Sequence, residues 1–143
     1  MAESDYWMHH MKESEIASWR GIAFEEVCMQ HVQQIKMALQ IAGVTSQESS
    51  LVVNGDDDTD GMQIDLLIDR ADDVVNVCEM KYSKTGYTIT KSYAETLQKR
   101  IDTLERLQPD KTFHLTFVTV NPIEHNSYSD IVKSAITADE LFK

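Results

Sequence analysis

Three charged residues interrupt two short segments that otherwise have the composition of β-strands. Asp65 lies in the first segment, residues 63–69, while Glu79 and Lys81 lie in the second, residues 74–82. Both segments are rich in aliphatic and β-branched residues, and a short polar turn separates them, so we predict a β-hairpin. Carboxylates and ammonium groups are rarely buried unless they are paired or bind a metal. The pattern therefore indicates a functional site on this hairpin.

Side-chain alternation sets which residues of the hairpin share a face. Asp65 should lie beside Gln63 and Leu67, and Glu79 should lie beside Lys81. If the two faces coincide, an Asp, a Glu and a Lys converge on one region of the sheet. The alternative is a surface hairpin on which Glu79 and Lys81 pair across a solvated face.

The order of an Asp, a short hairpin and a Glu-x-Lys tripeptide resembles the core of the PD-(D/E)XK nuclease superfamily, which includes restriction endonucleases and archaeal Holliday-junction resolvases. Three separated segments, 20–25, 61–70 and 78–83, are similar to the nuclease-like domain that ends a family of bacterial and archaeal AAA-type ATPases. The likeness runs from about Tyr6 to the C-terminus. It implies one nuclease-like domain over residues 1–143, with 1–13 as an N-terminal extension or the remnant of a linker to an ATPase domain.

The resemblance implies a divalent-metal site in this hairpin. Asp65 and Glu79 are the expected ligands of Mg²⁺ or Mn²⁺, and the backbone carbonyl of Met80 would add a third. Mg²⁺ takes only one or two protein carboxylates and keeps several waters, which leaves room for a phosphate oxygen. Lys81 would orient the attacking water and neutralise charge that develops on the phosphate. The expected activity is metal-dependent hydrolysis of DNA phosphodiester bonds.

A third acid is expected from the first helix, where Glu25 and Glu26 are adjacent. At about 100° per residue, Glu26 falls opposite the apolar stripe that contains Phe24 and Cys28, while Glu25 falls at its margin. Glu25 can therefore reach past the packed face toward the sheet. It is also the position at which resolvase-like enzymes carry their first acid, so Glu25 completes the predicted catalytic set.

Three further residues are candidates for accessory roles. Gln63 shares the predicted face of Asp65 and is placed to contact substrate or a water at the metal. Lys91 and Tyr93 open the second helix near the site by family analogy, although Tyr93 also fits the apolar stripe of that helix. The five histidines do not share a face or a ligand spacing, which argues against a zinc site.

Periodicity and turn residues predict an α/β fold with a restriction-endonuclease-like core. The order is helix, three strands, helix, strand, and the strand-helix-strand unit should cross over into a parallel pairing. We expect a mixed central sheet flanked by helices. The segments are a helix over 14–42, strands over 49–54, 63–69 and 74–82, a helix over 89–107 and a strand over 112–120. No Gly-rich P-loop is present, so this chain is not itself the ATPase.

Charge and composition limit the partners. The chain has 143 residues and a formal net charge of −11, which predicts weak DNA affinity because phosphate contacts need cations. No apolar run approaches the ~20 residues of a membrane span and no signal peptide is evident, so a cytoplasmic location and no membrane partner are expected. Cys28 and Cys78 have no disulfide or metal spacing and are predicted to be reduced core residues.

Two hypotheses of different class follow. The first is a DNA endonuclease-like domain, a C-terminal module of an AAA-type ATPase or a relative of one. The second is a catalytically degenerate nuclease fold that acts as a protein interaction or regulatory module, which the acidic charge favours. Apolar residues Trp7, Met11 and Trp19 predict an interface, either in a homodimer or with an ATPase domain.

Overall fold

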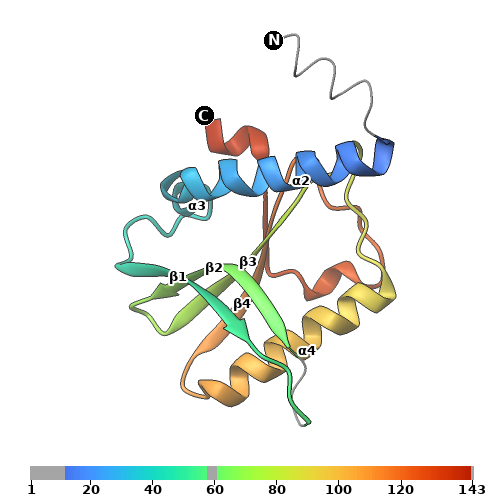
Figure 1. The fold of residues 1–143 in the computed structure, drawn as a ribbon. Helices are drawn as coiled ribbons and strands as arrows, with labels where there is room; N and C mark the ends of the chain where they lie inside the picture. Colours follow the sequence, from blue (N-terminus) through green and yellow to red (C-terminus); the bar gives the residue numbers. More distant parts are fainter. Residues whose placement is uncertain (1–11, 58–60, 143) are drawn as a thin grey trace.

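The computed structural model describes residues 12–57 and 61–142, so most of the N-terminal extension lies outside the described residues. A five-stranded sheet runs through the centre, with helices on both of its faces (Figure 1). The elements in chain order are α2 (Glu13–Gln30), α3 (Val32–Ala38), β1 (Ser46–Val53), β2 (Met62–Arg70), β3 (Val74–Lys81), α4 (Lys91–Leu107), β4 (Thr112–Thr119), the 3-10 helix η1 (Ser129–Ile131), β5 (Ser134–Thr137) and the 3-10 helix η2 (Ala138–Phe142).

The sheet is mixed, in the order β1-β2-β3-β4-β5. The first three strands form an antiparallel meander, whereas β3 pairs with β4, and β4 with β5, in parallel. Helix α4 provides the long crossover that a parallel pair of consecutive strands requires. The prediction of an α/β fold with a mixed sheet and flanking helices is confirmed.

Each face of the sheet is closed by its own apolar cluster. Helices α2 and α3 and the 3-10 helix η2 cover one face, and α4 covers the other (Figure 1). Leu97, Ile101 and Leu104 of α4 are buried at helical spacing. On the opposite face, Phe24 and Cys28 of α2 are buried. Both predicted apolar stripes therefore face the core.

The first helix was predicted to be continuous, but in the structure it breaks at His31. This residue leaves the helical region, with φ −123° and ψ 32°. Its ring Nδ1 lies 2.7 Å from the Val27 carbonyl oxygen, and its own N–H donates to Cys28, three residues back. These local bonds replace the lost helical ones. Helix α3 then ends at Ala38, before the predicted end at residue 42, and Gln40 rather than Gly43 takes the left-handed conformation, with φ 63°.

The C-terminal segment contains a strand that is not among those predicted from the sequence. β5 has only four residues and pairs in parallel with β4. Ile136 is its buried residue and packs in the cluster beneath α2 and α3. A strand of this length carries too little alternation to be distinguished from a loop.

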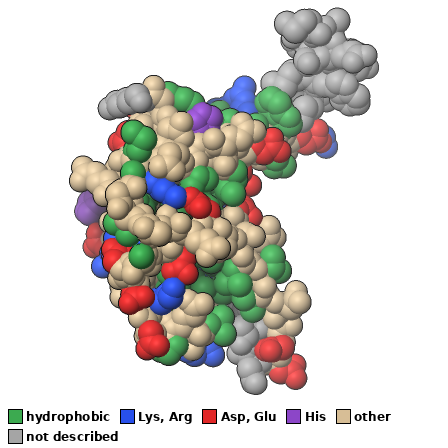
Figure 2. All heavy atoms as spheres, turned by 90° about the vertical axis from the view of Figure 1, so that its left-hand side faces the viewer, with side chains coloured by type: hydrophobic (Ala, Val, Ile, Leu, Met, Phe, Trp, Pro, Cys, Tyr) green, Lys and Arg blue, Asp and Glu red, His purple; other side chains and the backbone are tan. Residues whose placement is uncertain are grey.

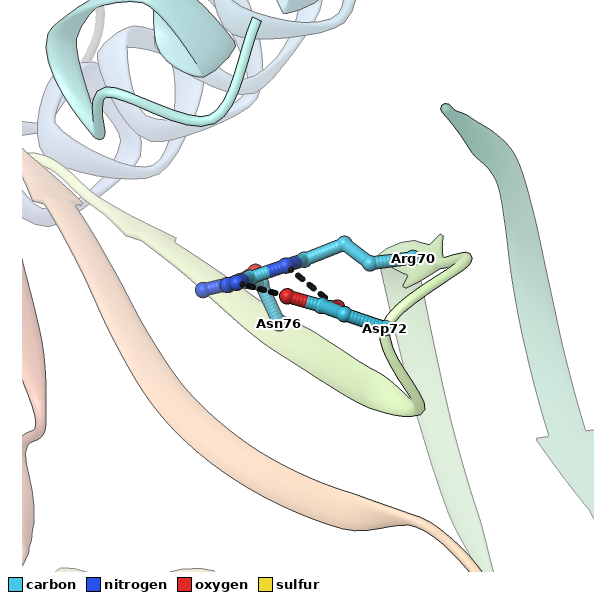
Figure 3. A network of polar contacts seen from close by, with 3 residues as sticks. All are labelled: Arg70, Asp72 and Asn76. Carbon is cyan, nitrogen blue, oxygen red and sulfur yellow. Dashed lines mark hydrogen bonds and ion pairs between the residues drawn. The ribbon is translucent and has the colours of Figure 1, made fainter. Parts of the chain in front are cut away.

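The β2–β3 turn is held by a polar network that is separate from Asp65, Glu79 and Lys81 (Figure 3). The Arg70 guanidinium donates to both carboxylate oxygens of Asp72, at 3.1 and 2.6 Å, and to the Asn76 side-chain oxygen at 3.2 Å. The amide of Asn76, which is 2% exposed, donates to the Thr116 hydroxyl on β4 at 3.0 Å. This chain of bonds ties the hairpin end to the next strand and satisfies a buried amide.

Candidate active site

A β-bulge in β2 determines where Asp65 points. Ser49 of β1 pairs with Leu67, but Leu51 pairs with Ile64, so β2 carries one extra residue between these two pairs. Side chains change face across the bulge. Leu66 packs on the α2 side of the sheet, whereas Ile64 packs on the α4 side. Bulges commonly re-aim side chains beside functional sites.

The bulge corrects one detail of the predicted hairpin. Asp65 does share a side with Gln63, whose Nε2 donates to Asp65 Oδ1 at 3.0 Å. Leu67, which strict alternation places on the same face, packs instead against the cluster beneath α4. Strict alternation fails because the extra residue shifts the pleat by one position.

The pairing of β2 with β3 ends immediately before the charged residues. Its last pair is Leu66 with Cys78, and Asp65 and Glu79 are the next residue on each strand. Beyond this point β2 pairs only with β1, so a gap opens between the two strands. The carboxylates meet in this gap rather than on one regular face of the sheet.

A cavity of about 130 Å³ occupies the gap. It brings together all four predicted catalytic residues: Glu25 from α2, Asp65 from β2, and Glu79 and Lys81 from β3. The remaining lining residues are Gln63, Cys78, Met80 and Arg100. Helix α2, the β2–β3 hairpin and helix α4 thus contribute charged groups to a single small space.

Helix α2 orients the two neighbouring acids differently, as predicted. Glu25 is half-buried and lines the cavity, whereas Glu26 is exposed and does not. Burial and the nearby charge of Asp65 raise the pKa of Glu25; Lys81 opposes this rise, and Glu79 adds to it. Burial is the largest cause of this raised pKa, and the negative charges of Asp65 and Glu79 add to it.

The raised pKa of Glu25 predicts how stability depends on pH in the metal-free protein. An acid whose folded pKa lies above the unfolded value of 4.5 costs progressively more stability as pH rises from that value through its folded pKa. Glu25→Gln should therefore gain stability relative to the wild type between about pH 4.5 and 7. Urea unfolding in EDTA across this range measures the difference. Glu26→Gln is the matched control, and the same pH trend in both variants would contradict the assignment.

Glu79 is the most tightly held of the site carboxylates. Its Oε1 accepts from Arg100 Nη1 of α4 at 2.9 Å, and its Oε2 accepts from the Tyr93 hydroxyl at 3.4 Å. The Glu79 side chain is only 10% exposed. Arg100 was not among the residues predicted for the site. The only sequence signal for it is its position three residues beyond the buried Leu97, on the side of α4 that faces the sheet.

Lys81 and Tyr93 form a second contact at the site. The Lys81 ammonium lies 5.1 Å from the centre of the Tyr93 ring, within the range of a cation–π interaction. Burial and the Glu79 charge raise the pKa of Tyr93 far above its usual range, so this hydroxyl remains a donor. Tyr93 thus both packs in the core and orients two site residues, while Lys91 is exposed at the start of α4 and does not line the cavity.

The two cysteines lie beside the site as protonated thiols. Cys28 and Cys78 are buried free thiols, as predicted. Burial raises the pKa of each thiol to about 12. Both thiols are therefore protonated at neutral pH when no metal is bound.

The cavity offers oxygen donors of the type that hard divalent cations bind. Asp65 and Glu79 supply two carboxylates at the gap, and Met80 lines the same cavity. Within residues 12–57 and 61–142, no three His, Cys, Asp or Glu side chains are arranged to hold a metal by themselves. Two carboxylates with waters is nevertheless the arrangement that Mg²⁺ commonly uses.

A larger groove adjoins the cavity and shares Glu25, Gln63 and Asp65 with it. It has a volume of about 560 Å³ and lies between α2 and the β1–β2 pair. Ile22 of α2 and Val52 of β1, which are 60% and 65% exposed, form part of its apolar lining. On the face at this edge of the molecule, the Lys and Arg side chains of the described residues are scattered among acidic and apolar ones (Figure 2).

No family model and no curated protein matches the chain. Among solved structures, the chain is similar to the crystal structure of AF1548, a protein of unknown function, with a TM-score of 0.49 and 16% sequence identity. The alignment covers 73% of this chain and 55% of that one, so this chain spans about half the length of AF1548. The likeness is too distant to assign a function.

Proposed function

We propose that this chain is a divalent-metal-dependent DNA endonuclease-like domain that hydrolyses phosphodiester bonds. The observation that carries the proposal is the cavity in which Glu25, Asp65, Glu79 and Lys81 converge. Four charged residues from three elements in one space of about 130 Å³ are costly unless they serve binding or chemistry. The PD-(D/E)XK resemblance, based on the same residues, supports the same reaction.

The residues have distinct roles in the proposed reaction. Mg²⁺ or Mn²⁺ held by Asp65, Glu79 and the Met80 carbonyl would supply Lewis-acid stabilisation of the charge that develops on the phosphate. Gln63 orients Asp65 through its 3.0 Å hydrogen bond. Lys81, positioned over the Tyr93 ring, orients the attacking water and adds positive charge near the phosphate. Water adds to phosphorus as the bond to the leaving oxygen breaks, and the proton that this water loses passes through solvent to the leaving oxygen, which departs as a hydroxyl.

Weak DNA binding is part of the proposal. Besides the net charge of −11, three cations that follow the motif are already paired: Lys84 with Glu13, Arg100 with Glu79, and Lys111 with Asp69. These pairs reduce the charge available for phosphate contacts. An AAA-type ATPase domain would supply the missing affinity in the proposed assembly.

A cytoplasmic location also belongs to the proposal. DNA is available as a substrate there, and the reducing environment suits the free Cys28 and Cys78. None of the helices in the described part of the chain has the length and apolar character that crossing a bilayer requires.

An exposed apolar surface favours a partner for α2. Trp19, Ile22 and Met29 of α2 are 54%, 60% and 43% exposed. The predicted interface included Trp7 and Met11, which lie outside the described residues. A homodimer or an ATPase domain packed on this surface would bury the three side chains, and the same surface favours the alternative function, a degenerate nuclease fold that binds a protein.

A cleavage assay tests the proposed function. Purified protein is incubated with single-stranded, duplex and branched DNA in Mg²⁺, Mn²⁺ or EDTA. We expect cleavage of at least one DNA form with metal, none in EDTA, loss of cleavage in Glu25→Ala and near-normal cleavage in Glu26→Ala. If no DNA form is cleaved, alone or with a cognate ATPase, the interaction-module function replaces the nuclease.

A further inference from the structure

Arg100 forms an ion pair with the Glu79 carboxylate, which the proposed metal also needs. Arg100 Nη1 lies 2.9 Å from Glu79 Oε1, and the Tyr93 hydroxyl covers Oε2. The side chains of Glu79 and Arg100 are 10% and 24% exposed, so the contact is partly shielded from water. In this arrangement the charge of Glu79 is already neutralised by a residue of the chain itself.

A divalent cation and the guanidinium cannot both remain close to Glu79 at low cost. The cavity that Arg100 and Glu79 line has a volume of about 130 Å³, and two cations within a few ångströms repel strongly where water is scarce. The Arg100 N–H group and the Tyr93 hydroxyl also each take one acceptor site of the Glu79 carboxylate, which reduces the number left for a metal. On grounds of charge repulsion, we therefore expect binding of the cation to weaken the contact of Arg100 with this oxygen.

Building on the proposed nuclease function, we propose that Arg100 is an exchangeable counter-ion of the metal site. In the metal-free protein Arg100 holds the Glu79 carboxylate, and binding of a divalent cation releases it. The backbone position of Arg100 does not change, because Leu97, Ile101 and Leu104 of the same helix are buried in the core. The guanidinium therefore stays at the cavity wall.

The released guanidinium gains a second role as a phosphate ligand. Its planar set of N–H donors matches a phosphate or carboxylate, and these are strong charge-assisted hydrogen bonds. Lys81, the other cation that lines the cavity, is positioned over the Tyr93 ring. The two cations would then act on one scissile phosphodiester, so metal binding also assembles the substrate-binding group.

A purely structural ion pair makes the opposite prediction for metal affinity. If Arg100 only fixes the Glu79 carboxylate in the correct position for metal, its loss should weaken metal binding. If Arg100 competes with the metal, its loss should tighten metal binding. The sign of the change in affinity separates the two roles and does not depend on cleavage.

The experiment is a calorimetric titration of Mn²⁺ into full-length protein at pH 7.5. The variants are Arg100→Met, which keeps the length of the side chain without charge, and Arg106→Met as the control on the same helix. Arg100→Met should bind Mn²⁺ about tenfold more tightly than the wild type, since a hydrogen bond to a charged group has a net value of that order. Arg106→Met should match the wild type. Equal or weaker binding by Arg100→Met would overturn the exchange.

Thermal unfolding gives a second readout from the same samples. Without metal, Arg100→Met should melt well below the wild type because Glu79 is left without its partner. Saturating Mn²⁺ should remove most of this difference in melting temperature. If Arg100→Met folds only when Mn²⁺ is present, that rescue also supports the exchange. A difference that persists in Mn²⁺ would overturn it.

The charge-preserving variant Arg100→Lys separates competition from packing. Its affinity for Mn²⁺ should remain near that of the wild type, because a competing cation is kept. An affinity as high as that of Arg100→Met would contradict the proposal. If the wild type binds Mn²⁺ but cleaves no DNA, the proposed nuclease function is contradicted and the exchange is not. If the wild type cleaves DNA and Arg100→Met binds Mn²⁺ with the same affinity as the wild type, the exchange is contradicted and the nuclease function is not.

Discussion

Lys81→Ala is expected to reduce metal-dependent DNA cleavage by about 10²–10³-fold, the usual cost of losing one electrostatic stabiliser of a transition state. The substitution removes the ammonium group that lines the cavity but leaves Asp65 and Glu79 in place. Binding of Mn²⁺ and the fold should therefore be retained. Single-turnover cleavage and a Mn²⁺ titration on the same preparation measure the two properties separately.

Lys84→Ala provides the matched control for Lys81. Lys84 lies three positions further along the chain, with a side chain that is 59% exposed and pairs with Glu13 at 3.4 Å. Its loss should leave the rate of cleavage nearly unchanged, since exposed ion pairs contribute little. If Lys81→Ala and Lys84→Ala cleave at the same rate, Lys81 does not act on the reacting phosphate.

Asp65→Asn should abolish most of the stabilisation that a divalent cation gives to the wild type. A ligand at 100 times its dissociation constant stabilises the native state by about 2.7 kcal/mol. For a domain of this size, that raises the melting temperature by roughly 10 °C. The effect arises because the cation would bind the native site, which Asp65 and Glu79 line, and not the unfolded chain. Thermal unfolding with and without Mn²⁺ measures the shift in both proteins.

Asp57→Asn tests whether the acidic surface binds the metal nonspecifically. Asp57 is exposed in the loop between β1 and β2 and lies outside the cavity. Asp57→Asn should retain the full increase in melting temperature. Equal increases in the wild type and Asp65→Asn would remove Asp65 from the metal site.

The central part of the site was predictable because it depends on local geometry. The β2–β3 hairpin places Asp65 and Glu79 next to the last paired residues, and the spacing of that hairpin is visible in the sequence. Helical periodicity likewise separated Glu25 from Glu26, since a difference of about 100° decides which side chain reaches the sheet. Backbone periodicity narrowed the candidates, and the family resemblance supplied the expectation that these acids form one site.

The remaining features depend on tertiary packing. No Gly or Pro marks the bulge in β2, so nothing in the sequence indicated that Ile64 and Leu66 face opposite sides. Arg100 is 21 residues from Glu79, and their contact exists only because α4 crosses back over the sheet. The break at His31 is stabilised by its own ring contact with Val27 rather than by a helix-breaking residue type.

A crystal structure with Mn²⁺ tests most directly whether this cavity is a metal site, because anomalous scattering locates the ion. We expect an anomalous peak in the cavity, bound by the carboxylates of Asp65 and Glu79, with Arg100 moved away from Glu79. Strong peaks only at surface acids, with Arg100 still paired to Glu79, would contradict the claim that this cavity is a metal site.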